Sequence, residues 1–226
     1  MNNNIKPVDF KLGQYISEGY ELYRANFGKV LLATFFVFVM SIIPFCSYLA
    51  QGNFLKFMKR LKNGQNPEAS EIFNFDDFLP YLKLFLVIFG GIILLELPIL
   101  IPLIAAGTRN VEPQIPAYFP IYMIVLIVAI FYIFARGIYI PALISLKNVS
   151  SVREAWRISN RMTAGNVLVI IAFLFVITFL SQLGFLACFI GIFITLPFYY
   201  TALFFAQDDG LQQQYGAENS SFIRKF

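Results

Sequence analysis

Long apolar stretches separated by short polar ones are the main pattern of this chain. Five of these stretches approach or exceed the roughly 20 residues that a helix needs to cross a bilayer. They comprise residues 29–50, 81–106, 117–146, 166–183 and 187–206. The last two belong to one uncharged run about twice as long as a single span, so the chain has to turn back between Gly184 and Gly191. The pattern predicts an all-α polytopic membrane protein with five hydrophobic segments.

Polar stretches next to these segments carry apolar residues at helical spacing. Residues 8–27 place apolar side chains at i, i+3, i+4 and i+7 opposite charged ones, which predicts an amphipathic interfacial helix. Residues 53–63 and 151–163 repeat this pattern with basic polar faces. Bases on such helices suit anionic lipid headgroups or a docked partner. The residues assigned to this docking role are Lys56, Lys59, Arg60, Lys62, Arg153, Trp156, Arg157 and Arg161.

The charges that flank the segments bear on topology. If all five segments crossed, the two sides would carry nearly equal numbers of Lys and Arg, without the usual excess on the cytoplasmic side. If the first segment instead enters the bilayer and returns to the same side near Pro44, Arg109 is the only base counted on the outer side. A six-span alternative splits 117–146 at Arg136 and leaves too few residues for two full spans. We favour the re-entrant first segment, with most loops and the tail in the cytoplasm.

The end of the chain differs from the rest. Residues 207–226 are polar and Gln-rich without sustained periodicity, and we expect them to be disordered. The opposite end is also polar, and the first apolar run starts only near Lys29, so no cleavable signal peptide is expected.

Composition supports the membrane assignment. Hydrophobic residues make up 58% of the chain and charged ones 13%, and the mean hydropathy is +0.70, values outside the range of soluble domains. The net charge of +4 comes from bases beside apolar segments, which favours anionic headgroups over nucleic acid as the partner. Cys46 and Cys188 both lie inside apolar runs, where a small hydrophobic thiol is the ordinary interpretation.

The chain lacks the residues of common catalytic sites. It contains no histidine, which removes the commonest general base, the usual haem ligand and the ligands of most catalytic zinc and iron sites. It has no nucleophile elbow, no phosphate-binding glycine loop and no cysteine pair with metal-site spacing. We expect no enzyme activity and no cofactor.

Glu96 and Arg136 are the ionisable residues deepest in the apolar segments. Such charges are functional candidates because burying them unpaired in a bilayer is costly. Counted from the ends of their segments at about 1.5 Å per residue, their depths differ by roughly 6 Å, which side chains can bridge. We predict an intramembrane Glu96–Arg136 ion pair with a structural role. A transport or ligand site, or an unpaired Arg136 that snorkels to the surface, are the alternatives.

Asp76 and Asp77 form a weak candidate metal site. Paired carboxylates can bind a divalent cation, but adjacent residues on a helix point in different directions. A solvated acidic face is the favoured interpretation, and no metal is predicted.

Four parts of the chain resemble a known family. They are Glu18–Phe27, the loop Gly64–Phe78 that ends in Ile72–Phe78, the stretch Ala155–Asn166 and Gly191–Pro197. Together they resemble a broad group of bacterial integral-membrane proteins related to the membrane domain of some glycerophosphodiester phosphodiesterases. Similar proteins are often labelled carotene monooxygenases, but that iron chemistry needs histidines. The resemblance implies a multi-pass protein of the bacterial inner membrane that assists other components.

These observations lead to a functional hypothesis. We expect a non-catalytic membrane subunit or scaffold that binds anionic lipids, other membrane subunits or a second copy through its basic helices. The alternative is a small transporter or lipid-handling protein that uses Glu96 and Arg136. A lipid-acting enzyme that uses Asp76, Asp77 or Glu96 is a third hypothesis.

Overall fold

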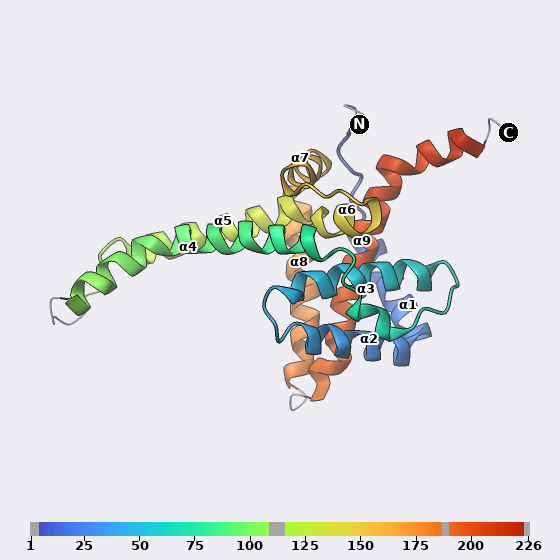
Figure 1. Ribbon diagram of the computed structural model, residues 1–226, viewed down its shortest axis with the longest axis horizontal. Helices are drawn as coiled ribbons and strands as arrows, with labels where there is room; N and C mark the ends of the chain where they lie inside the picture. Colours follow the sequence, from blue (N-terminus) through green and yellow to red (C-terminus); the bar gives the residue numbers. More distant parts are fainter. Residues whose placement is uncertain (1–4, 109–115, 187–189, 224–226) are drawn as a thin grey trace.

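The computed structural model describes residues 5–108, 116–186 and 190–223. All regular structure within these ranges is helical, which confirms the predicted fold class. A body of packed helices carries one helical hairpin, which projects from it (Figure 1).

The N-terminal part consists of α1 (Leu12–Ala25), α2 (Phe27–Met40) and α3 (Cys46–Lys62). The bend between α1 and α2 is 102°, so the charged helix and the apolar helix point in different directions. The segment predicted at 29–50 is not one helix, because α2 ends at Met40 and a turn containing Pro44 leads into α3. The chain therefore bends where the re-entrant prediction placed it, but the returning helix is the basic α3.

A short helix, η1 (Ala69–Phe73), connects α3 to the projecting hairpin of α4 (Phe78–Thr108) and α5 (Phe119–Gly137). Pro102 has no N–H, so the Pro98 carbonyl one turn earlier lacks its helical donor. The Tyr118 hydroxyl donates to that carbonyl at 2.7 Å, and the Tyr122 hydroxyl donates to the Leu95 carbonyl. A neighbouring helix thus satisfies a backbone group that proline frees, as apolar surroundings require.

The C-terminal part consists of α6 (Ile140–Lys147), α7 (Val152–Met162), α8 (Val167–Gln182), η2 (Leu183–Leu186) and α9 (Ile190–Ile223). The bend between α7 and α8 is also 102°, and Gly165 lies at this corner with a positive φ of 81°. Gly184 lies so close to Gly191 and Thr195 that a side chain would not fit there. The predicted reversal between Gly184 and Gly191 is therefore present, and α9 packs against α8.

α9 forms the centre of the body and contacts α1, α2, α3, α6 and α8. Phe204 and Ala206 are fully buried, and Gly19 of α1 packs directly against the backbone of Ala202. The tail predicted to be disordered from residue 207 instead continues this helix to Ile223. Gln207 and Asp208 are buried and bond to the Ile138 carbonyl and to Lys59, and apolar periodicity does not reveal such positions.

Within the described residues, two helices are long and apolar enough to cross a membrane, namely α4 and the stretch Phe119–Lys147 that joins α5 to α6. The bent pairs α1–α2 and α7–α8 raise this number to four if each pair counts as one span. At about 1.5 Å per residue, α2 and α8 alone are shorter than a hydrocarbon core of about 30 Å. The apolar helices indicate a membrane-embedded protein, and the prediction of five hydrophobic segments is not confirmed.

Candidate functional site

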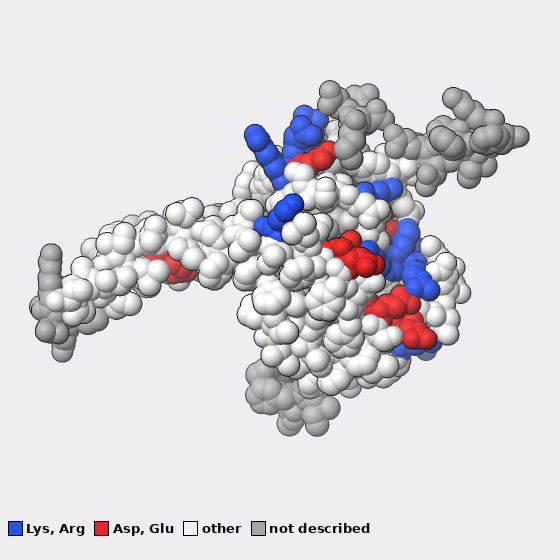
Figure 2. Space-filling view, viewed as in Figure 1, with Lys and Arg blue, Asp and Glu red and all other residues white. Residues whose placement is uncertain are grey.

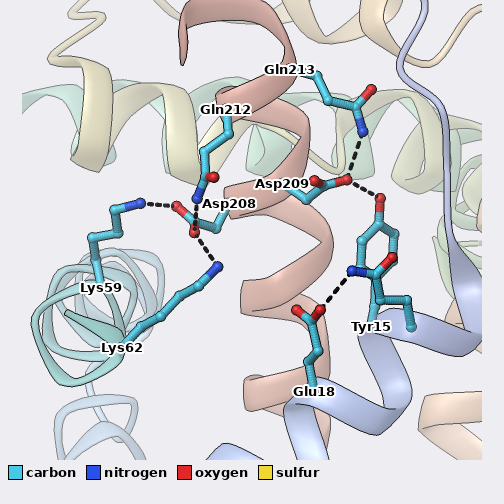
Figure 3. A network of polar contacts seen from close by, with 9 residues as sticks. Tyr15, Glu18, Lys59, Lys62, Asp208, Asp209, Gln212 and Gln213 are labelled. Atoms are coloured by element: carbon cyan, nitrogen blue, oxygen red, sulfur yellow. Dashed lines mark hydrogen bonds and ion pairs between the residues drawn. The ribbon is translucent and has the colours of Figure 1, made fainter. Parts of the chain in front are cut away.

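The first candidate site is a buried carboxylate on α9. Asp208 has a side chain that is 2% exposed, and it accepts from Lys59 at 2.6 Å and from Lys62 at 2.9 Å. Gln212, one turn further along α9, donates to the same carboxylate at 2.7 Å. Figure 3 shows both lysines reaching from α3 toward this carboxylate. We call this arrangement of Asp208, Lys59, Lys62 and Gln212 the α9 clamp, because it ties the polar half of α9 to α3.

The next residue, Asp209, faces α1 instead (Figure 3). It accepts from the Tyr15 hydroxyl at 2.6 Å and from Gln213 at 2.6 Å. Tyr15 lies on α1, outside the long apolar helices, and burial together with this hydrogen bond raises the pKa of its phenol. The phenol therefore stays protonated and keeps its role as a donor. Two adjacent aspartates thus join α9 to two different helices, which is a structural role.

The bases of α3 are neutralised within the molecule. Besides the two lysines of the α9 clamp, Lys56 lies 2.7 Å from Asp77, and Arg60 lies 2.5 Å from Glu71. These four residues were predicted to bind headgroups or a partner. Each base has a carboxylate partner supplied by η1, by Asp77 directly before α4 or by α9, and the docking role of these bases stays a prediction.

Asp76 and Asp77 do not act together. Asp76 receives the side-chain amide of Asn74 at 2.9 Å, while Asp77 pairs with Lys56. Within the described residues, no group of three or more Cys, Asp or Glu side chains is arranged to hold a metal ion. The two aspartates therefore have different partners within the fold.

The second candidate site is the exposed side of α7. Arg153, Trp156, Arg157 and Arg161 are all exposed. The opposite side of the helix packs into the body through its buried residues Ala155, Ile158, Ser159 and Met162. Glu154 lies 4.0 Å from Arg157, at the limit of an ion pair, and most of the arginine side chain is exposed. We call the four exposed residues the α7 arginine face.

Local sequence explains the position of α7. Ser151 precedes the helix and accepts the backbone N–H of Glu154 at 3.4 Å, as an N-cap residue does. Ser159 donates to the Arg136 carbonyl at 2.6 Å, and Arg136 donates to the Asn160 carbonyl at 3.0 Å. These bonds attach the buried side of α7 to the end of α5. The arginine face therefore points away from the body on a fixed helix.

The structure does not bring Glu96 and Arg136 together. The hydrogen bond from Tyr122 to the Leu95 carbonyl aligns Glu96 with the start of α5. Arg136 comes fourteen residues after Tyr122, about 21 Å along the helix. Its guanidinium instead donates to the Asn160 carbonyl and to the Tyr132 hydroxyl, at 3.0 and 3.1 Å. The predicted ion pair is absent from the described residues, because the prediction took both segments as starting at one level.

Sequence reasoning did not find Asp208 or Tyr15. The available signal was the pair of adjacent acids directly after the last apolar run, in a chain whose 53–63 helix carries an excess of bases. Their pairing depends on tertiary packing, which joins residues 149 positions apart.

The fold and these sites define a membrane-embedded helical protein with a buried acidic clamp and an exposed basic helix. No protein-family model matches the chain, no curated protein matches it, and no solved structure matches it.

Proposed function

We propose that this chain is a non-catalytic membrane scaffold whose α7 arginine face binds the headgroups of anionic lipids. The observation that carries the proposal is the exposure of Arg153, Arg157 and Arg161 on a helix whose other side is buried. The apolar helix α8 leaves α7 at 102°. Such a corner suits a helix that lies along a membrane surface and leads into one that enters the apolar region.

The distribution of charge supports α7 over α3 as the lipid-binding helix. Figure 2 shows Lys and Arg gathered on the body, while the projecting hairpin is almost uncharged. On α3 the bases lie beside carboxylates, so little net charge is left for a headgroup. Among the described residues, the α7 arginine face has one weak contact with a carboxylate, from Arg157 to Glu154. Each base near an anionic membrane surface contributes about 1 kcal/mol to the free energy of binding.

Trp156 allows a direct test, because it is the only tryptophan in the chain. Its exposed fraction is 37%, so its fluorescence reports on what lies against α7. The full-length chain is placed in phosphatidylcholine vesicles containing a minor share of brominated phosphatidylglycerol or, separately, brominated phosphatidylcholine. We expect the brominated anionic lipid to quench Trp156 several-fold more strongly than the neutral one.

A matched pair of variants assigns the effect. Replacing Arg153, Arg157 and Arg161 by Gln should abolish the preference for the anionic lipid. Replacing Lys11, Arg24 and Lys29 by Gln removes the same charge from exposed positions on α1 and α2 and should preserve it. Equal quenching by the two lipids in the unmodified chain would refute lipid binding by α7.

The finer parts of the assignment belong to the same proposal. Residence in a bacterial inner membrane, cytoplasmic loops and a supporting role beside other membrane components follow from the family resemblance and from the charge pattern. The transporter alternative used Glu96 and Arg136 as one site. These residues are separated in the structure, so no transport proposal is based on them.

A further inference from the structure

Glu96 lies at the middle of an uncharged stretch of α4. Between Lys83 and Thr108 it is the only charged residue. At about 1.5 Å per residue, Glu96 lies roughly 20 Å from Lys83 and roughly 18 Å from Thr108 along the helix. If α4 crosses a bilayer, this carboxylate is therefore near the midplane, where an unpaired charge is costly.

No partner for this carboxylate is present on the described part of the hairpin, 78–108 and 116–137. Glu96 makes no hydrogen bond and no ion pair with any residue that the structure describes. Arg136, the only charged residue of α5, is held at the far end of that helix by the Asn160 carbonyl. The nearby hydroxyls of Tyr118 and Tyr122 are directed at backbone carbonyls of α4.

The helix around Glu96 is also uncovered. Only 6% of the most apolar window of α4 is buried, compared with 17% for the stretch that contains α5. Ile92, Leu94 and Ile101 are more than half exposed, so apolar surface surrounds the carboxylate on both sides along the helix. Such a surface can pack against another membrane helix, and a polar group at its centre can fix which helix binds.

We propose that the α4–α5 hairpin binds a membrane-spanning helix of another protein that carries one Lys or Arg near its midpoint, with Glu96 as the counter-ion. This proposal rests on the scaffold function proposed above, and names the partner's chemistry. Charge complementarity carries it, because a base at the same depth would relieve the cost of the carboxylate. Lipid headgroups lie too far from the midplane to do so.

A second copy of this chain cannot supply that base. In two copies inserted in the same direction, equivalent residues of the hairpins lie at the same depth in the bilayer. The bases on α4 and α5 are Lys83, near the start of α4, and Arg136, near the end of α5, and these two helix ends adjoin the body (Figure 1). At the level of Glu96 another copy offers a second carboxylate, which repels the first when both are ionised.

The test uses a defined probe in vesicles. The full-length chain, labelled with a donor dye, is reconstituted with an acceptor-labelled Leu/Ala transmembrane peptide that has one Lys at its centre. The matched peptide has Leu there. We expect the Lys peptide to associate about tenfold more strongly with the unmodified chain. Glu96→Leu should remove this difference, and Glu96→Lys should transfer the preference to a peptide with a central Glu.

Three outcomes would overturn the proposal. They are equal association of the Lys and Leu peptides, an unchanged preference in Glu96→Leu, or self-association between labelled copies that depends on Glu96. Glu96→Gln removes the charge and keeps the shape of the side chain, so it checks that loss of the charge alone does not unfold the chain. The two proposals can fail independently of each other. Glu96→Leu should leave the quenching of Trp156 by anionic lipid unchanged, and the triple Gln variant of α7 should leave the association of the Lys peptide unchanged.

Discussion

The ammonium group of Lys59 lies 2.6 Å from the carboxylate of Asp208, and this contact joins α3 to the polar half of α9. The lysine is 32% exposed and the aspartate 2%, so the buried partner is the acid. A buried carboxylate with two cationic partners is satisfied only while α3 and α9 stay together. The stretch of α9 around Asp208 is therefore part of the folded body.

Removing the charge of Asp208 should destabilise the protein. Asp208→Asn keeps the size of the side chain but leaves Lys59 and Lys62 as two like charges without a counter-ion. We expect a loss of about 2–3 kcal/mol, moderated because water reaches both lysines. Thermal unfolding in detergent, followed by circular dichroism, measures it. Asp76→Asn, at an exposed turn, is the control and should change stability by less than about 0.5 kcal/mol. Equal melting temperatures for Asp208→Asn and the unmodified chain would rule out a stabilising α9 clamp.

Two glycines on α1 should respond to alanine in opposite ways. A Cβ on Gly19 would lie 2.8 Å from the Cα of Ala202, and a backbone atom cannot move aside cheaply. Gly19→Ala should therefore cost about 1–3 kcal/mol. A Cβ on Gly13 meets nothing within 4 Å, so Gly13→Ala should be neutral or stabilise by up to about 1 kcal/mol. Melting temperatures of the two variants check the sign, and a tolerated Gly19→Ala would contradict the close packing of α1 on α9.

The sequence predicted elements whose signal is local. The extent of α4 follows from its own apolar run, and the start of α7 follows from Ser151, whereas the run at 117–146 is divided between α5 and α6. Helical spacing also identified the basic side of α3. It could not show that carboxylates far away in the sequence occupy those bases, because spacing carries no information about tertiary partners.

The tail and the Glu96–Arg136 pair show the same limit. The buried positions of α9 after the apolar run include Gln207 and Asp208, so a search for apolar periodicity passes over them. For the Glu96–Arg136 pair, counting residues gives the difference in depth only if the two helices begin at the same level in the bilayer. The tyrosine hydrogen bonds set a different register between α4 and α5, and no pattern in either segment encodes it.

Two glutamines near the end of α9 should control the order of the N-terminal segment. Gln214 exchanges hydrogen bonds with the backbone of Lys6 at 3.1 and 2.8 Å, and Gln213 does the same with Asp9 at 2.8 and 3.0 Å. Replacing both glutamines by Ala removes these bonds, each with a net value of about 1 kcal/mol. Amide hydrogen exchange in residues 5–9 should then be at least roughly tenfold faster.

The control for this experiment replaces Gln14 and Gln65 by Ala. Gln14 donates to Glu18 within α1, and Gln65 accepts from Arg60, so neither contacts the N-terminal segment. Exchange in residues 5–9 should remain as in the unmodified chain. Faster exchange in both double variants would show a general loosening of the fold, and unchanged exchange in both would show that the glutamines do not hold this segment.

Glu96 and Arg136 should contribute to stability independently. Arg136→Gln loses the bond to the Asn160 carbonyl, which attaches α7 to α5, and should destabilise by about 1–2 kcal/mol. Glu96→Gln breaks no contact within the described residues and should have little effect. The double variant should equal the sum of the single changes within about 0.5 kcal/mol, as for distant sites. The same cycle on Lys59 and Asp208 is the positive control and should give a clear coupling energy. A comparable coupling between Glu96 and Arg136, or rescue by exchanging the two charges, would show that they meet in the membrane and would contradict the register set by Tyr118 and Tyr122.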